Sequence, residues 1–278
     1  MTSTKTHVVI PDTQVKNGVP LDHLTWIGQF IVDEFLDQEN VRLIHLGDHW
    51  DMPSLSQYDE GKKEMEGRMY MADIEIGNQA FELLNAPLTN LNRLRLKAHR
   101  RQWWPESRDF LLGNHEDRIS RAISKTPKLD GVISLSQLRV GDLGWTSHGF
   151  LDPIEYEGVS YAHYFYNPLT GIPFGGMIES RLKTIGHTFT MGHQQVLLYG
   201  TRYVGKRAQH GLVAGACYLH HENYKGPQGN SHWRGIIVKR NVCDGDYDIQ
   251  LISLAALCQR YEGVSLEKFL AKKYHLTW

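Results

Sequence analysis

Short apolar runs alternate with amphipathic segments in the first half of the chain. Residues 7–11 and 41–46 are apolar runs that end at Asp12 and Asp48, and residues 21–36 between them have apolar side chains at helical spacing. Short continuous apolar runs are typical of buried strands. A helix between two such strands predicts a parallel β–α–β unit, and therefore an α/β fold.

Residues 52–107 have no strand pattern. Residues 65–84 have helical spacing, and Pro87 predicts a break in that helix because proline has no N–H to donate. Residues 91–101 are rich in arginine and lysine, which is typical of a solvated helix face, with a nucleic-acid or phosphate contact as the alternative. We therefore expect one domain over residues 1–278, with a mainly helical insertion at about 52–107.

A third apolar run, residues 108–112, precedes a second half that is rich in short β-like segments. The turns between these segments carry glycine, asparagine or aspartate. Helices are predicted at residues 177–185 and 266–274. The predicted later strands lie at residues 145–148, 154–156, 159–163, 188–191, 211–218, 233–239 and 247–254.

Net charge, cysteine pattern and the length of apolar stretches each limit the class of protein. The formal net charge is −1, so any attraction to nucleic acid must come from a local basic patch. The three cysteines form no CxxC pair, which favours a reducing compartment. No secretory leader pattern and no apolar stretch of about 18 residues is present, so we expect a cytoplasmic protein without a membrane span.

Polar clusters follow the apolar runs. The first three clusters are Asp12-Thr13-Gln14, residues 47–51 (Gly-Asp-His-Trp-Asp) and residues 113–116 (Gly-Asn-His-Glu). His163 ends a later strand, and residues 192–195 (Gly-His-Gln-Gln) end another. Ligands of parallel α/β sheets bind beyond the carboxyl ends of the strands. Carboxylates, an amide and imidazoles gathered there are suitable ligands for a divalent metal.

In their order and strand context these clusters resemble the motifs of the calcineurin-like metallophosphoesterase superfamily, particularly its phage-type members. The resemblance covers residues 8–195, and the second and third motifs match fully. It implies a four-layer α/β/β/α sandwich with mixed sheets, and the hydrolysis of phosphate esters at a dinuclear metal centre. For a phage-encoded protein, the compartment would be the host cytoplasm.

The resemblance also implies a role for each matched residue. Asp48 would bridge two metals, and Asp12 would bind the first of them. His115 would protonate the leaving oxygen or bond to its developing charge, and Asp51 would orient the His115 imidazole. The second metal would be held by Asn114, His163 and His193.

The chain differs from the family at two positions. In the family, histidines at these positions would bind the first metal, whereas this chain has Gln14 and Gln195. A glutamine amide oxygen is a neutral, hard and weak donor, which favours Mn²⁺ or Mg²⁺ over Zn²⁺, or leaves the site weakly bound. We expect mainly Mn²⁺, with Mg²⁺, Zn²⁺, Fe or Ni²⁺ as other candidates, and a weaker first site.

Several other residues near the motifs have a plain structural interpretation. We expect His45 to pack, His187 to be a cap or surface residue, and residues 220–224 to form a solvated loop, with a position at the mouth of the site as the alternative. His49 either packs or touches substrate. Arg118 either steers phosphate or makes a structural contact, and we expect Trp103 and Trp104 to pack within the insertion.

Three functions remain open at the level of sequence. The first is a phosphodiesterase or nuclease acting on DNA, RNA or a nucleotide, favoured by the resemblance and by the basic residues 91–101. The second is a phosphatase acting on proteins or small phosphomonoesters. The third is a non-catalytic metal-binding scaffold, against which the retention of His115 and Asp51 argues. The sequence does not determine the substrate or the oligomeric state.

Overall fold

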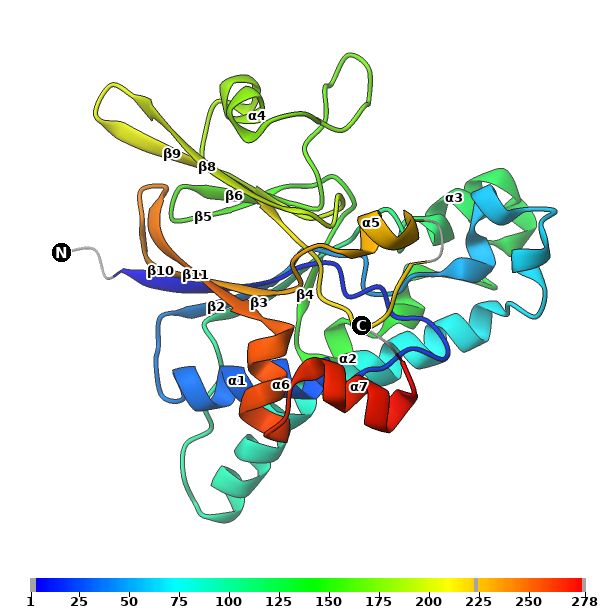
Figure 1. The fold of residues 1–278 in the computed structure, drawn as a ribbon, viewed down its shortest axis with the longest axis horizontal. Helices are drawn as coiled ribbons and strands as arrows, with labels where there is room; N and C mark the ends of the chain where they lie inside the picture. The colour runs from blue at the N-terminus through cyan, green and yellow to red at the C-terminus, as the bar shows by residue number, and fades with distance from the viewer. Residues whose placement is uncertain (1–3, 223–224, 277–278) are drawn as a thin grey trace.

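The computed structural model describes residues 4–222 and 225–276, and it contains a six-stranded mixed sheet (Figure 1). The strands of this sheet are β1 (Lys5–Ile10), β2 (Val41–His45), β3 (Ser107–Leu111), β4 (Thr146–His148), β10 (Gly235–Cys243) and β11 (Asp246–Ser253). Their order is β11-β10-β1-β2-β3-β4. β1, β2, β3 and β4 run parallel, whereas β10 is antiparallel to both of its neighbours.

The remaining strands form a second, five-stranded mixed sheet. They are β5 (Ile154–Tyr156), β6 (Val159–Ala162), β7 (Phe189–Met191), β8 (Leu197–Val204) and β9 (Arg207–Ala214), and they pair in the order β5-β6-β7-β9-β8. β6, β7 and β9 are parallel, and hairpins add β5 and β8 at the two edges. The predicted α/β class with mixed sheets is confirmed.

Helices cover the outer faces of both sheets (Figure 1). α1 (Asp22–Phe35), α2 (Tyr70–Lys97), α6 (Leu254–Glu262) and α7 (Leu266–Tyr274) lie on the side of the first sheet that faces away from the second. α4 (Ile178–Ile185) packs on β8 and β9, and α3 (Arg118–Lys125) and the short α5 (Gly226–Asn230) lie near the ends of the sheets. Over the described residues, no helix has the length and apolar character that crossing a membrane requires.

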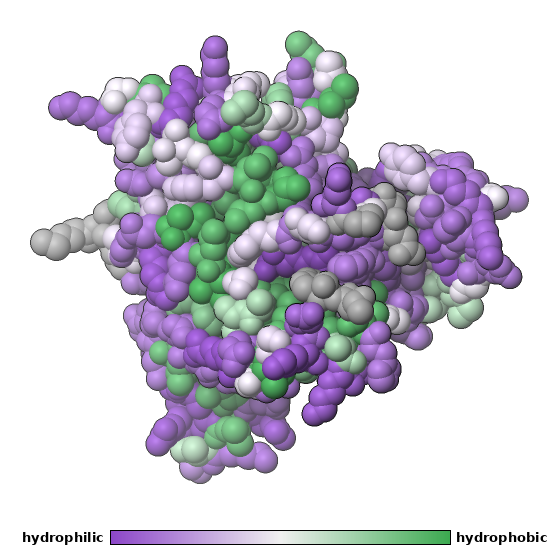
Figure 2. Space-filling view, in the orientation of Figure 1, coloured by the Kyte–Doolittle hydropathy of each residue, from purple (hydrophilic) through white to green (hydrophobic). Residues whose placement is uncertain are grey.

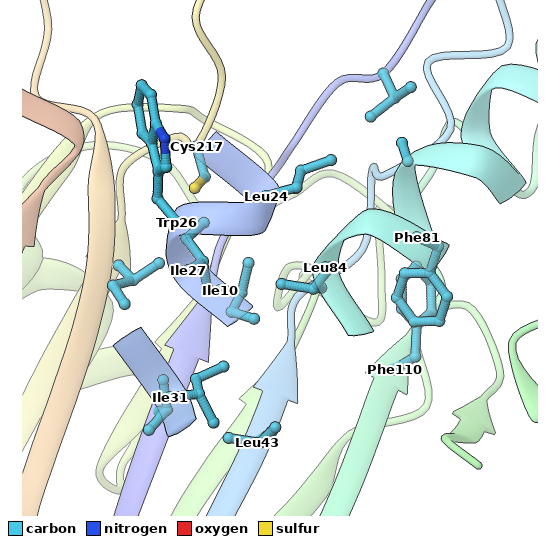
Figure 3. Close-up of a cluster of buried hydrophobic side chains, with 14 of the residues drawn as sticks. Ile10, Leu24, Trp26, Ile27, Ile31, Leu43, Phe81, Leu84, Phe110 and Cys217 are labelled. Atoms are coloured by element: carbon cyan, nitrogen blue, oxygen red, sulfur yellow. The ribbon is translucent and has the colours of Figure 1, made fainter. Parts of the chain in front are cut away.

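Two cores explain the continuous apolar runs of the first strands. Ile10, Leu43 and Phe110 point toward α1 and α2, where they meet a large apolar cluster (Figure 3). Val9 and Ile44, from alternate positions, point to the second sheet instead. A strand that is buried on both faces needs apolar residues at successive positions rather than at every second one.

On the face shown in Figure 2, polar residues surround an apolar strip that crosses the middle of the molecule, where the two sheets meet. β8 and β11 are the edge strands of their sheets, and Tyr199 and Leu251 on them are exposed. The core between the sheets therefore reaches the surface at this edge.

The predicted break at Pro87 is wrong, because α2 continues through it to Lys97. Gly28 of α1 lies against Pro87 and the Leu84 carbonyl so closely that a Cβ there would clash with both. Burial of α2 against α1 thus holds the helix together despite the missing N–H. The rest of residues 52–107 includes three short 3₁₀ turns, so the region is mainly helical as expected. These turns are Pro53–Leu55, Gln57–Asp59 and Lys63–Met65.

The elements α3, β8, α5 and α6 were not predicted. β8 forms a hairpin with β9, and α6 follows β11 directly, where the sequence pattern indicated only a strand end. α6 buries Leu254, Leu257 and Cys258 against the first sheet's helical layer. Further 3₁₀ turns at Pro127–Leu129, Leu135–Leu138 and Gly141–Leu143 connect α3 to β4.

Candidate metal centre

The predicted site residues lie on loops at one end of both sheets. Asp12, Asp48 and Asn114 follow β1, β2 and β3, whose carboxyl ends coincide because these strands are parallel neighbours. His163 and His193 follow β6 and β7, which are also parallel neighbours. The structure therefore brings distant residues into direct contact. For example, the backbone N–H of His193 donates a hydrogen bond to Asp12, which lies 181 positions earlier in the chain.

Four side chains converge on one point. Among the described residues, Asp48, His163 and His193 offer ligand atoms that all lie within 4.8 Å of one another. Asn114 completes the group, since its Oδ1 lies 2.9 Å from His163 Nε2 and 2.7 Å from His193 Nδ1. This buried cluster of aspartate and histidine could hold a metal ion.

The hydrogen bonds of His163 direct its Nε2 into the cluster. His163 Nδ1 donates to the Leu46 carbonyl at 2.7 Å, so a neutral ring carries a lone pair on Nε2. That lone pair faces Asn114 Oδ1, and Asp48 Oδ2 at 3.3 Å. Electron pairs held this close require a positive charge between them, either a proton or a metal.

The charges of the cluster agree with this interpretation. Burial lowers the pKa of His163, but the Asp48 charge more than offsets it and raises that pKa to about 9. Burial and the neighbouring His163 lower the pKa of His193 to about 4, so His193 is neutral and suited to ligation. The charges of His115 and His163 overcome burial and hold the pKa of Asp48 well below its usual range.

The position that the resemblance assigns to a first metal, around Asp12, has no histidine pair like that of the cluster described above. Asp12 Oδ2 is buried without a hydrogen-bond partner among the described residues, and burial raises the pKa of Asp12 to about 7. Gln14 directs its amide nitrogen, not its oxygen, toward Asp48 Oδ2 at 3.3 Å. The Gln195 amide oxygen already accepts hydrogen bonds from Tyr218 and Lys225. The oxygen of Gln195 is therefore already hydrogen-bonded, and Gln14 turns its N–H₂ group, rather than its oxygen, toward Asp48.

His115 and Asp51 form a close pair beside the cluster. His115 Nδ1 lies 2.8 Å from Asp51 Oδ1 and 2.8 Å from the Asp51 carbonyl, which orients the ring. Its Nε2 is 3.7 Å from Asp48 Oδ2. Burial lowers the pKa of His115, but Asp48 and Asp51 outweigh it and raise that pKa above its usual value. The His115 imidazole is thus oriented by Asp51 with its Nε2 directed toward the cluster.

A chain of ion pairs extends outward from Asp51. Lys16 Nζ lies 3.2 Å from Asp51 Oδ2 and 2.7 Å from Glu222, which is 4% exposed. Glu222 Oε1 also accepts a hydrogen bond from His220 Nε2 at 2.8 Å. The prediction of a solvated loop is therefore wrong for residues 220 and 222, because Lys16 and Asn230 hold Glu222 inside the protein. The rest of that prediction, residues 223 and 224, lies outside the described residues.

Glu116 has a role that we did not predict. Its buried carboxylate accepts four backbone N–H bonds at 2.7–3.0 Å, three from residues 48–50 and one from Gly113. The two motif loops are therefore joined by one side chain. The only signal in the sequence is the acidic residue that directly follows His115 in the third motif.

Three residues beside the motifs make structural contacts. His49 is buried and bonds to Thr13 and to the Gly77 carbonyl, so its packing interpretation is correct. His45 stacks on Phe110 at 4.8 Å. Arg118 donates to the carbonyls of Asp51 and Met52, and it thereby fixes the loop that carries Asp51.

The remaining predictions concern residues away from the centre. His187 is exposed beyond the end of α4, as expected. Trp103 is buried and bonds to Gln38, and Trp104 stacks with Arg108. Most of residues 91–101 are exposed, as expected for a solvated helix face, and Figure 1 places this end of α2 far from α3 and α5.

No model of a known protein family matches this chain, and no curated protein matches it either. The case for its function therefore depends on the geometry of the site and on the order of its motifs.

Proposed function

We propose that this protein is a metal-dependent phosphoesterase of the calcineurin-like type, with phosphodiesters, including nucleic acids or nucleotides, as its preferred substrates. The observation that carries the proposal is the convergence of Asp48, Asn114, His163 and His193 next to the His115–Asp51 pair. In this proposal the two sheets and their helical layers form the four-layer sandwich of that family, with the insertion at residues 52–107 as part of a single domain.

In the proposed reaction, the metal ion and the residues around it would have different roles. When bound, a divalent cation, which we expect to be Mn²⁺, supplies Lewis-acid stabilisation of the phosphoryl charge and makes water more acidic. Asp48, Asn114, His163 and His193 would hold it. The residues that surround the cluster, among them Glu116 and Arg118, keep the loops in place so that little reorganisation accompanies the reaction.

His115 is placed to act as the general acid. Its Nδ1–H is held by Asp51, so Nε2 is the atom that faces the cluster and can transfer a proton. As the bond between phosphorus and the leaving oxygen breaks, that oxygen would take the proton from Nε2. An alkoxide is a poor leaving group that needs such a proton, in diesters and monoesters alike. We favour phosphodiesters because the motifs resemble those of the phage-type members. The His115–Asp51 pair is not required for holding a metal, and it supports an enzyme over a scaffold.

The proposal predicts different effects for two substitutions. His115→Gln should lower kcat on a short DNA oligonucleotide, whose leaving group is a sugar alkoxide, by about 10²–10⁴, because it removes the acid, while the Mn²⁺ content stays unchanged. Bis-p-nitrophenyl phosphate, a diester whose nitrophenolate leaves without a proton, should be affected less. Asp48→Asn should lower the Mn²⁺ content and the activity together, because it weakens the metal-binding cluster. Metal content is measured by mass spectrometry after dialysis against Mn²⁺.

His187→Gln is the matched control, since His187 is an exposed histidine far from Asp48 in the chain. Faster hydrolysis of p-nitrophenyl phosphate than of the diester would favour the phosphatase alternative. Mn²⁺ binding without turnover of either compound would indicate the scaffold, and loss of Mn²⁺ from His115→Gln would contradict the assigned role of His115.

A further inference from the structure

Lys225 is directed into the first metal position. It precedes α5, and its Nζ donates to Gln195 Oε1 and, at 3.2 Å, to the Tyr218 hydroxyl. Tyr218 itself donates to Gln195 at 2.8 Å. A glutamine therefore stands where the family would have a metal-binding histidine, and its oxygen faces an ammonium group.

Asp12 and Glu222 are the acidic residues close to Lys225. The Cys217 N–H, next to Tyr218 in the chain, donates to the Asp12 carbonyl at 2.8 Å, which places Tyr218 and Lys225 beside Asp12. Burial lowers the pKa of Lys225 to about 8, and the charges of Glu222 and Asp12 partly offset this and favour the ammonium form. Asp12 Oδ2, buried without a hydrogen-bond partner among the described residues, is the carboxylate oxygen that this positive charge can stabilise.

The donor set suits an ammonium group better than a metal ion. An ammonium carries three N–H donors and is well matched to an amide oxygen, a phenol oxygen and a carboxylate. A divalent transition metal instead needs imidazoles or several carboxylates, and Gln14 directs an N–H₂ group at Asp48. Lys16, the other nearby lysine, is already held between Asp51 and Glu222.

We propose that the Lys225 ammonium takes the place of the first metal, so that each chain binds a single divalent cation at Asp48, Asn114, His163 and His193. A phosphoryl oxygen of the substrate would replace the Tyr218 hydroxyl, which lies 3.2 Å from Nζ, as an acceptor of the ammonium. This inference rests on the proposed phosphoesterase function and specifies its metal content. From the sequence we expected a dinuclear centre whose first site binds metal weakly. The inference replaces that expectation with a single-metal centre.

Metal stoichiometry and electron paramagnetic resonance test the proposal directly. At saturating Mn²⁺, the wild-type protein should bind one Mn²⁺ per chain and show the signal of an isolated ion. Lys225→Gln should still bind one Mn²⁺, but kcat/KM for bis-p-nitrophenyl phosphate should fall about 10²-fold because a charged donor to the phosphoryl group is lost. Lys225→Arg should recover part of that loss, and Lys206→Gln, in the exposed turn after β8, is the control.

A triple variant tests whether a second metal can bind once the ammonium is removed and the two histidines are introduced. The triple variant Gln14→His, Gln195→His and Lys225→Ala restores two imidazoles and removes the ammonium, and it should bind a second Mn²⁺ with a spin-coupled signal. Two spin-coupled Mn²⁺ ions in the wild-type protein would overturn the inference, as would unchanged kinetics in Lys225→Gln. A failure of the proposed function looks different, because the wild-type protein would then hydrolyse neither ester.

Discussion

Four residues of the candidate site have left-handed backbone conformations, and none of them is glycine. Their φ angles are 45° at Gln14, 50° at Asp48, 67° at His193 and 55° at Gln195. Such conformations cost about 1 kcal/mol or more each and persist where surrounding contacts impose them. Glu116 supplies these contacts at Asp48, because its carboxylate holds the N–H groups of residues 48–50. A single buried carboxylate thus stabilises the loop that carries Asp48, the central residue of the candidate metal centre.

At this scale we predict that Glu116→Gln lowers the free energy of unfolding by about 2 kcal/mol or more, because a neutral amide leaves buried N–H groups without their charged acceptor. Urea unfolding measured in the presence of a chelator checks this without a contribution from bound metal. Asp117→Asn, which alters the next and less buried carboxylate, should have a much smaller effect. Equal losses in the two variants would show that Glu116 does not hold the loops.

At the scale of elements, α2 supports the motif loop that follows β2. His49 Nε2 donates to the Gly77 carbonyl of α2 at 3.0 Å, and the Trp50 indole lies directly on Gly77. Any Cβ at Gly77 would clash with that indole. The helical region between β2 and β3 is therefore part of the support of the site, because it determines where Trp50 and the adjacent Asp51 lie.

Gly77→Ala tests this contact. Alanine favours a helix by about 1 kcal/mol over glycine, but displacement of Trp50 should outweigh this and lower stability by about 1–3 kcal/mol. Activity should fall as well, because Asp51 moves with Trp50. Thermal unfolding and ester hydrolysis are the measurements. Gly141→Ala, where a Cβ would meet no atom within 4 Å, is the matched control and should leave both unchanged.

At the scale of the whole molecule, buried polar groups join the two sheets. His7 on β1 accepts a hydrogen bond from the Tyr161 hydroxyl at 2.6 Å through Nδ1 and donates from Nε2 to Glu157 at 2.8 Å. This arrangement requires a neutral imidazole, and burial, followed by the charge of Lys239, lowers the pKa of His7 to about 4. Burial likewise lowers the pKa of His23 to about 3 and that of His49 to about 4.

These shifts predict loss of stability in mild acid. A histidine whose pKa is lower in the folded state binds its proton first in the unfolded state, so stability falls as pH drops from about 6.5 toward about 4. His7 alone would account for roughly 2–3 kcal/mol over that range. His7→Gln should therefore show a smaller loss between about pH 7 and about pH 5 than the wild-type protein. Urea unfolding with a chelator present measures it, and a pH dependence identical to that of His187→Gln would contradict the role of His7.

Much of the site could be predicted because its residues obey a local rule. Asp12, Asp48 and Asn114 each follow an apolar run, and parallel neighbouring strands necessarily end at the same edge of a sheet. Other features have no local signal. Pro87 remains helical because α1 packs against it, and β8 is recognised only once it pairs with β9.

The amino-acid sequence by itself determined the α/β class, the first three parallel strands and the identity of the polar residues that follow them, since these depend on hydrophobic periodicity and short-range order. Only the tertiary structure decided how the two glutamines are used, which four N–H groups Glu116 binds, and that Lys225 faces Gln195. Those outcomes depend on contacts between residues that lie far apart in the chain, and the direction of a side chain within a site is set by all the elements that surround it.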